Sequence, residues 1–473
     1  MSINLIKFFF LMFLCFFLCD SSKSLPLQDS IKLKTSQLDS AKKFILGKVL
    51  IQGNKITKDE VILREMKIKE NMPFNLEDIQ DDFLRIYNLG LFTKVDIMPL
   101  PAGENTVNLL IIVEETYYIL PIPIGGFEGG DFKKFWGGVD LRWRNFRGMN
   151  ETVGSGFALG YKPFISFSYF NPWVGEKSHL FLSGNLKYSK FKNHSLFDST
   201  QNLTLYTENQ INDFNIENIS ASLTIGKYFS YALSSSIQLS FNYTKPSVNL
   251  PGSTLNPDGI DKYLSLIYEF SYDTRNLYEY TTNGSLYKVI YNRFGFSSDY
   301  FDFNKIKMDL RRYILIKTHS FFELTYAFRV LSVTSFGRDM PSYLKEIIGA
   351  NDYVRGWKDY FAEGDNKLCL FNEIRIPIVE PYYISGKNIP IVRGISILNR
   401  FSYKFGLFGT FFYDIGGVWN KNNNFFKTQF LNGFGTGINL ILPFSLVSRF
   451  ELAYRITNGK LIPKFNINLN SSF

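Results

Sequence analysis

Cysteine and histidine are scarce in this chain of 473 residues, with three of each. Cys15 and Cys19 lie near the amino terminus, so the remainder holds only Cys369, and one cysteine forms no internal disulfide. The histidines lie far apart, without the spacing of metal ligands. No glycine-rich phosphate loop opens a helix, and no serine elbow joins a strand to a helix. We therefore expect no enzyme, no metal site and no cofactor.

Long apolar runs are also scarce. The run near the start, Phe8–Cys19, follows Lys7 and has about a dozen residues, too few to cross about 30 Å of hydrocarbon as a helix. It fits a secretory signal peptide, so we expect a signal at 1–24 and a polar tether at 25–45; an uncleaved anchor is the alternative. An exported chain without another long apolar segment is soluble, anchored or a β-barrel.

Charged residues make up only 20% of the chain, whereas aromatic residues make up 17%, with 48 Phe and 28 Tyr. The net charge of +9 comes from scattered lysines and arginines without a basic block, so we expect no nucleic-acid partner. Mean hydropathy is -0.06 despite the aromatic residues. Strands that alternate apolar and polar side chains average towards zero in this way, whereas long apolar helices do not.

Residues 46–116 carry the signals of a small α+β domain with the order β-α-α-β-β. Thr57, with Glu60 three residues later, has the pattern of a capping box at the start of a helix. Asn75 is suited to cap a second helix, and Gly90 is suited to end it. The expected strands lie at 48–52, 95–98 and 107–113.

The same segment resembles the polypeptide-transport-associated (POTRA) domain. The "GN" turn after the first strand, "FN" before the second helix, "LGLFTKV" and the terminal "VEE" stand where that domain has them. One copy is visible, whereas assembly proteins of the family usually carry several. The resemblance implies a domain that offers sheet edges to incoming unfolded strands.

Residues 117–473 contain recurring short runs of alternating apolar and polar residues, such as "SSSIQLSFNYTK" and "FGTFFYDIGGVW". We count sixteen runs, the first of which, "YYILPIPIG", contains two prolines that are unusual in a strand. Their spacing suits tilted membrane strands of about 9 to 11 residues. The sequence therefore predicts a mainly β fold: a roughly 16-stranded transmembrane antiparallel β-barrel after the POTRA-like domain. The alternative is a soluble β-repeat protein, whose exposed faces would not be this aromatic.

Connector lengths support the barrel. Long connectors at 189–218 and 247–260 fall at odd places in the order, whereas connectors such as "KTHS" and "PFSL" at even places are tight. Outer-membrane barrels have long outer loops and short periplasmic turns in this alternation. The segment 378–397 is an exception, because its place predicts a long inner connector.

The segment "GANDYVRGWKDYFAEGDN" forms the sixth outer connector. Its "VRGW" resembles the VRGF/Y loop of the BamA-type outer-membrane assembly and two-partner secretion superfamily, with Trp where the family favours Phe or Tyr. The resemblance implies that the loop folds back into the barrel lumen, where Arg355 meets carboxylates of the wall. Gly356 would permit a tight turn, and Tyr353 and Trp357 would pack the tip against the wall.

Two carboxylates fit this expectation. Glu373 lies in "NEIRIPI" on the twelfth run, and Asp414 lies in "FFYDIGGVW" on the thirteenth, in the FxDxG arrangement. Strand alternation places each of them on the opposite face from its neighbours, so both can face a polar lumen. A guanidinium binds carboxylates bidentately, which lysine cannot do.

The last run has Phe465, Ile467, Leu469 and Phe473 on one face. A terminal strand that ends in an aromatic residue resembles the signal by which such barrels are themselves inserted. The "DTRN" at 273–276 also resembles the family, although ordinary turn-forming residues explain it equally well.

The resemblance implies a protein of the bacterial outer membrane, with its POTRA-like domain in the periplasm, that folds and inserts other barrels. Its expected partners are unfolded outer-membrane proteins, outer-membrane lipid, and periplasmic chaperones or accessory lipoproteins. A polypeptide exporter of the two-partner secretion type is the main alternative. A passive porin is a third reading, although a porin needs neither a soluble domain nor an arginine docked in its lumen.

Overall fold

The computed structural model describes residues 44–127, 135–175, 178–195, 205–207, 211, 214–278, 280–296, 300–317, 323–349, 354–358, 360–385, 388, 402–442, 446–457 and 459–469. Its first part is a small α+β domain with six elements. They are β1 (Phe44–Gln52), α2 (Asp59–Leu63), β2 (Pro73–Phe74), α3 (Leu76–Asn88), β3 (Phe92–Pro101) and β4 (Thr106–Glu115). The strands pair in the order β2-β1-β4-β3, with β1 parallel to β4.

The core of this domain lies between the two helices and one face of the sheet. Ile62 of α2 and Ile79 and Ile86 of α3 are buried together with Leu46 and Ile111 of the central strands. Burial of a side chain of this size stabilises a fold by about 1.5–3 kcal/mol, so the amphipathic helices are held mainly by packing.

The ends of α3 confirm the sequence prediction. The Asn75 side chain accepts the N–H of Asp78 at 2.9 Å, and the Asp78 carboxylate accepts the N–H of Asn75 at 3.0 Å. These two bonds form a reciprocal capping box. Gly90 follows the helix with a φ of 64°, the left-handed conformation that commonly ends a helix.

The predicted cap at Thr57 is wrong. Helix α2 begins at Asp59, and its N-cap residue makes no side-chain capping bond. The Thr57 hydroxyl and N–H donate instead to Glu115 Oε1, at 2.6 and 2.7 Å, because an ionised carboxylate is the stronger acceptor. Partial burial raises the pKa of Glu115, but the bonds from Thr57 and from the N–H of Ile56 outweigh burial and hold that pKa below its ordinary value.

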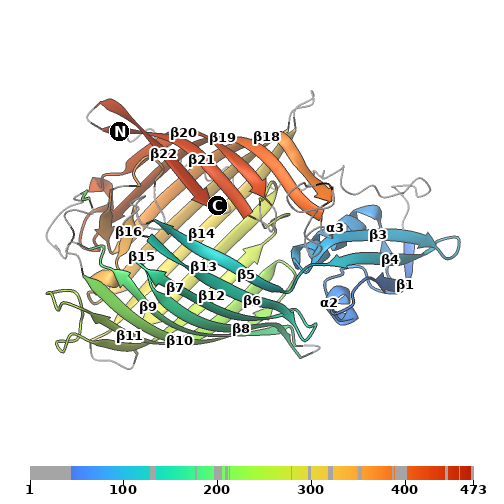
Figure 1. Cartoon of the computed structure of the whole chain (residues 1–473), viewed down its shortest axis with the longest axis horizontal. Coiled ribbons are helices and arrows are strands. Elements are labelled where there is room, and N and C mark those ends of the chain that lie inside the picture. The colour runs from blue at the N-terminus through green and yellow to red at the C-terminus, as the bar shows by residue number, and fades with distance from the viewer. Residues whose placement is uncertain are drawn as a thin grey trace. The chain divides into compact units, whose positions relative to one another are not determined.

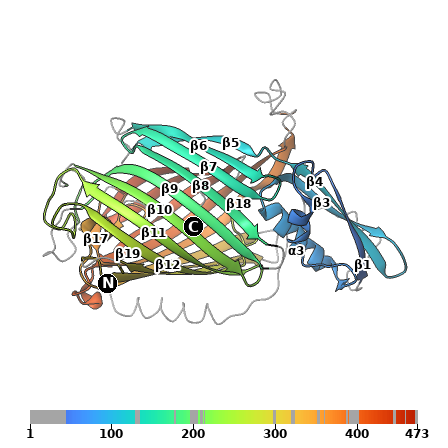
Figure 2. The same cartoon turned by 90° about the horizontal axis from the view of Figure 1, so that it is seen from below.

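The second part of the chain is one antiparallel sheet of sixteen strands, which confirms the predicted fold class. The strands are tilted and curve around a shared interior (Figures 1 and 2). They are β5 (Ile119–Phe127), β6 (Phe135–Phe146), β7 (Glu151–Gly160), β8 (Phe164–Val174), β9 (Leu180–Lys192), β10 (Asn215–Tyr228), β11 (Leu233–Pro246), β12 (Asp261–Asp273), β13 (Gly284–Phe294), β14 (Phe303–Lys317), β15 (Glu323–Gly337), β18 (Asn366–Ser385), β19 (Ser402–Trp419), β20 (Leu431–Leu442), β21 (Leu446–Thr457) and β22 (Lys460–Leu469).

The two faces of this sheet differ as the alternation predicts. Leu223 of β10 and its direct partner Leu239 of β11 are both about half exposed on the outer face. The neighbouring pair, Ser222 and Ser240, lies on the opposite face, where Ser240 is buried. An apolar outside with a polar inside is the pattern of a barrel that stands in lipid.

The sheet order has two ends, β5 and β22. Among the described residues no ladder joins these two strands, whereas each other neighbouring pair in the order is hydrogen-bonded. The barrel can close only where β5 meets β22, and we call this line the seam. None of the helices in the described residues is long and apolar enough to cross a membrane.

The expected long inner connector at 378–397 is wrong in its first part, because β18 continues to Ser385. The apolar residues Ile378 and Tyr382 are exposed, as outward-facing strand residues are. Register shifts around Val379 absorb the irregularity at Pro377, which is how a strand tolerates proline. The residues 386–387 and 389–401 lie outside the described part of the chain.

The connector between β15 and β18, residues 338–365, is called loop 6 below. It contains a 3-10 turn, η4 (Ser342–Leu344), and a short hairpin of β16 (Glu346–Ile348) and β17 (Ala362–Gly364). A second 3-10 turn, η7 (Phe425–Lys427), lies between β19 and β20.

Candidate functional site

Loop 6 is packed against the inner wall of the barrel by an apolar cluster. Val354 and Trp357 of the loop are buried together with Cys369 of β18, Val418 of β19 and Leu431 of β20. The N–H of the Trp357 indole donates to the carbonyl of Asn432 at 2.7 Å. These contacts hold the tip of the loop on the wall before any charge is considered.

Arg355 extends from this tip to three carboxylates. Its Nε and Nη2 donate to the two oxygens of Asp414, both at 2.7 Å. Its Nη1 donates to Glu373 Oε2 at 2.7 Å and to Glu451 Oε1 at 3.2 Å. The guanidinium also lies over the ring of Phe412, 3.7 Å from its centre. Arg355 is only 4% exposed, so water screens these charges poorly.

The structure thus brings together Arg355, Glu373 and Asp414, the three charged residues that the sequence analysis paired. Gly356 has a φ of 97°, in the left-handed region, and its carbonyl accepts a bond from Arg455 Nη1 at 3.0 Å. Tyr353 lies outside the described residues.

Sequence reasoning missed Glu451, because no motif marks it. The one available signal is the alternation in "SRFELAYRI", which places Glu451 on the same face of β21 as Arg449 and Arg455. In the structure the cluster is balanced in charge. Three arginines, Arg355, Arg375 and Arg449, contact three carboxylates, Glu373, Asp414 and Glu451.

Sequence reasoning also missed a row of glycines on β20. Gly433, Gly435 and Gly437 in "GFGTG" are two residues apart, so they share the inner face of the strand. A Cβ at Gly433 would collide with the carbonyl oxygen of Arg355, and a Cβ at Gly435 would lie 2.8 Å from the ring of Phe412. Gly433 therefore makes room for the backbone of loop 6, whereas the nearest atom to a Cβ at Gly435 would be the carbonyl oxygen of Leu452 on β21.

The predicted terminal signal is described only in part. Phe465 is 59% exposed on β22, as an outward-facing residue is, and the next residue, Asn466, is buried. Phe473 and the side chains of Ile467 and Leu469 lie outside what the structure describes.

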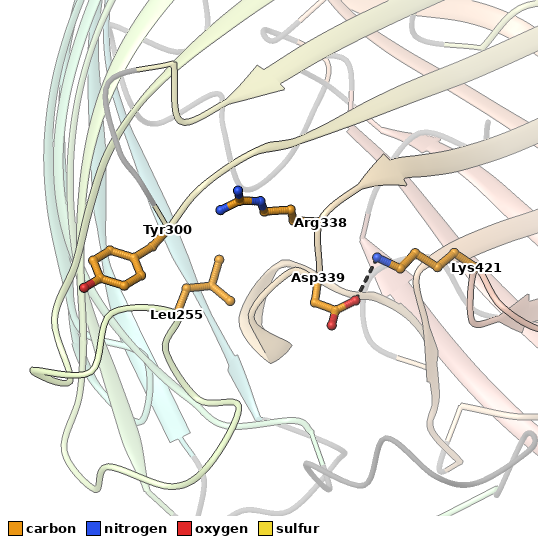
Figure 3. Close-up of a pocket in the computed structure, with 5 residues that line it drawn as sticks. All are labelled: Leu255, Tyr300, Arg338, Asp339 and Lys421. Carbon is orange, nitrogen blue, oxygen red and sulfur yellow. Dashed lines mark ion pairs between the residues drawn. The ribbon is translucent and has the colours of Figure 1, made fainter.

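A separate hollow of about 440 Å³ lies among the connectors, lined by Leu255, Tyr300, Arg338, Asp339 and Lys421 (Figure 3). Asp339 pairs with Lys421 at 2.7 Å, and the side chain of Arg338 is 65% exposed. The hollow is open to solvent, whereas Arg355 and its carboxylate partners are buried. Within the described ranges, no group of three or more His, Cys, Asp or Glu residues could hold a metal ion.

Comparison with known proteins gives matches over most of the chain. Residues 145–473 match the family model described as the Omp85 superfamily domain, and residues 44–116 match the POTRA model, described as a surface antigen variable number repeat. An outer membrane protein assembly factor BamA of Nitratidesulfovibrio vulgaris is 25% identical over 324 residues, which are 67% of this chain and 38% of that protein. A BamA of Neorickettsia risticii is 43% identical over 120 residues, 25% of this chain and 16% of that protein. The chain thus spans well under half the length of these relatives.

Solved structures share the fold. BamA from Haemophilus ducreyi lacking POTRA domains 1–3 has a TM-score of 0.53 at 16% identity, with 92% of this chain and 86% of that chain covered. CdiB from Escherichia coli has a TM-score of 0.59 at 12% identity, with 90% and 75% covered.

Proposed function

Because the chain belongs to the Omp85 superfamily, we propose that it is an outer-membrane assembly factor that folds β-barrel proteins and inserts them into the outer membrane. The POTRA domain lies in the periplasm and receives unfolded substrate strands. The substrates are unfolded outer-membrane proteins, and the surrounding partner is outer-membrane lipid. Periplasmic chaperones or accessory lipoproteins deliver substrates to the domain.

The observation that carries the proposal is the seam. A sheet edge whose backbone groups lack a ladder can pair with a strand from another chain. Both seam strands contain prolines, Pro121 and Pro123 in β5 and Pro463 in β22, and proline has no N–H to donate. The seam is therefore the weakest line of the barrel, and it is where an incoming strand can be added and released sideways into lipid.

The POTRA sheet supplies a second edge. Strand β3 stands at one end of the order β2-β1-β4-β3, so its outer side is available for an added strand. Backbone hydrogen bonds give affinity without demanding a particular sequence, which suits a receptor for many unfolded substrates.

The position of loop 6 favours sideways release of substrates into lipid and argues against a permanently open pore. Arg355 and Trp357 are buried against β18, β19 and β20, so the tip of loop 6 occupies space inside the barrel at this level. We propose that the contacts of Arg355 with Glu373, Asp414 and Glu451 lock loop 6 and brace the strands next to the seam. A passive porin would have no use for this arrangement.

Depletion of the protein in its native cell, followed by an inventory of outer-membrane proteins, tests the proposal. We expect many barrel proteins to fall together and to recover when the chain is supplied again. Loss of a single secreted polypeptide with unchanged barrels would instead indicate a two-partner secretion type exporter, and the insertase assignment would be withdrawn.

A further inference from the structure

The turn between β12 and β13, described at residues 274–278 and 280–283, is held by several side-chain hydrogen bonds, and we call it the inner turn. Asp273 at its base accepts two bonds from Arg275, at 2.9 and 2.7 Å. The Asn276 side-chain oxygen accepts the N–H groups of Thr282 and Asn283, at 3.2 and 3.1 Å. By the alternation of connectors, this turn lies at the inner, periplasmic end of the barrel.

The inner turn places Tyr280 in the lumen. Tyr280 is 2% exposed, and its ring centre lies 4.5 Å from that of Phe408 on β19. Ile441 of β20 and Val447 of β21 complete the same apolar cluster. The Tyr280 hydroxyl accepts a bond from Asn439 Nδ2 at 3.1 Å. A turn that leaves the sheet at β12 therefore packs on β19, β20 and β21, the strands that lead to β22.

Arg375 connects this turn to the loop 6 site. It is among the largest fully buried side chains, and its Nη1 donates to the carbonyl of Thr281 at 2.8 Å. Its guanidinium lies over the ring of Tyr280 at 4.6 Å. Its Nε donates to Glu373 Oε1 at 2.9 Å, while the other oxygen of Glu373 accepts the bond from Arg355 at 2.7 Å. One carboxylate thus holds the outer loop with one oxygen and the inner turn, through Arg375, with the other.

We propose that the inner turn is a second closure of the lumen, and that Arg375 is the positioning residue that couples it to loop 6 through Glu373. A buried carboxylate that loses one arginine is left with an uncompensated oxygen, which is costly in a site of low dielectric, so it turns away from the orientation in which it binds the other arginine. Release of either closure therefore weakens the other. The inference deepens the proposed function. One consequence rests on that function: both closures must move before a substrate can reach the seam strands from inside the barrel.

Cys369 provides a natural reporter of loop 6. It is buried in the apolar cluster of Val354 and Trp357, so its reaction with a maleimide requires the loop to move. The experiment uses the full chain in lipid vesicles, with labelling assigned to Cys369 by peptide mapping. Planar-bilayer conductance of the same preparation reports whether the lumen is open.

We expect Arg375→Ala to raise both the conductance and the labelling rate of Cys369, the latter by about tenfold, within the usual range of coupling between sites. Arg375→Lys keeps the charge without the planar fork, so its conductance and labelling rate are expected to lie between those of wild type and Arg375→Ala. Tyr280→Ala, which removes the ring under the Arg375 guanidinium and keeps Arg355 and Glu373 unchanged, is expected to raise labelling as well. Arg293→Ala is the matched control, since it removes an arginine that pairs with Asp302 at 2.6 Å, and labelling should stay within about twofold of wild type.

Higher conductance with unchanged labelling in the Arg375 and Tyr280 variants would overturn the coupling, and no change in either readout would overturn the second closure. If Arg375→Ala does not fold, as judged by its migration in detergent gels, Tyr280→Ala and Arg375→Lys carry the same test. This experiment needs no substrate protein, so it tests the coupling even if the depletion experiment rejects the assembly function. A negative result here would in turn leave the proposed assembly function standing.

Discussion

The guanidinium of Arg355 makes four contacts with carboxylate oxygens of three strands, β18, β19 and β21. A planar fork can do this, because its five N–H groups point in fixed directions within one plane. When the loop leaves, Asp414 loses the arginine that binds both of its oxygens, whereas Glu373 keeps Arg375 and Glu451 keeps Arg449. The residue therefore acts through geometry as much as through charge.

Arg355→Ala is expected to undock loop 6 without unfolding the barrel. Removing one partner of a buried ion pair costs on the order of 3–5 kcal/mol. This cost destabilises the docked position of loop 6, whereas the backbone ladders of the sixteen strands remain. Trypsin cleavage after Lys358 in intact cells measures undocking. Arg338 is already well exposed, so cleavage there serves as the internal reference.

Arg355→Lys should restore loop protection only in part, because an ammonium group lacks the fork. Asp414→Asn should resemble Arg355→Ala, and the double variant should be little worse than either, because both changes break the same contact. Full additivity, with normal protection in each single variant, would contradict the clamp.

Gly433→Ala tests the space that loop 6 occupies. A methyl group there would meet the backbone carbonyl of Arg355, which cannot swing away as a flexible side chain would. We expect cleavage after Lys358 to rise as in Arg355→Ala. The control is Gly184→Ala on β9, where a Cβ meets no atom within 4 Å. Equal protection in both glycine variants would show that loop 6 does not need a glycine at position 433.

Strand periodicity explains how much of the site could be predicted. A resemblance of four residues marked Arg355, and alternation placed Glu373 and Asp414 on the inner face. Glu451 could not be predicted as a partner of Arg355. Strand alternation gives its face, but its neighbours across the sheet depend on the register of β20 and β21, which the sequence does not give. Thr57 was misassigned since a capping pattern says nothing of a carboxylate 58 residues away.

At the scale of elements, sixteen strands were predicted because apolar and polar residues alternate in each of them. The boundary error at β18 has a local cause. Pro377 and Pro381 end the pattern in sequence, but register shifts let the strand continue beyond them. Strand continuity across such a bulge depends on the partner strand β19, which the sequence of β18 alone does not contain.

Disulfide trapping tests the seam. With Cys369 replaced by serine, cysteines placed on β5 and β22 should crosslink incompletely, because proline-bearing strands pair weakly. Where the lock is complete, function should be lost and then regained on reduction. Cysteines at Asn185 and Ser222, direct partners on β9 and β10, form the control and should crosslink without loss of function. Full activity of the protein with a quantitatively crosslinked seam would rule out lateral opening as the mechanism.

At the scale of the whole molecule, we expect heat-modifiable migration in detergent gels. Detergent alone does not unfold a closed barrel, because its strands have hardly any unpaired edge. Boiled and unboiled samples should therefore run differently, and far-UV circular dichroism should be dominated by strand. Identical migration with a helical spectrum would contradict the fold.

The assembly function itself is tested most directly in vesicles that contain only the purified full chain. An unfolded outer-membrane barrel protein is added, and its folded fraction is followed by gel migration over time. The account expects faster folding than in empty vesicles, a loss of that gain when the seam is locked by a disulfide, and its return on reduction. Folding no faster than in empty vesicles, or equal rates with the seam locked and unlocked, would contradict it.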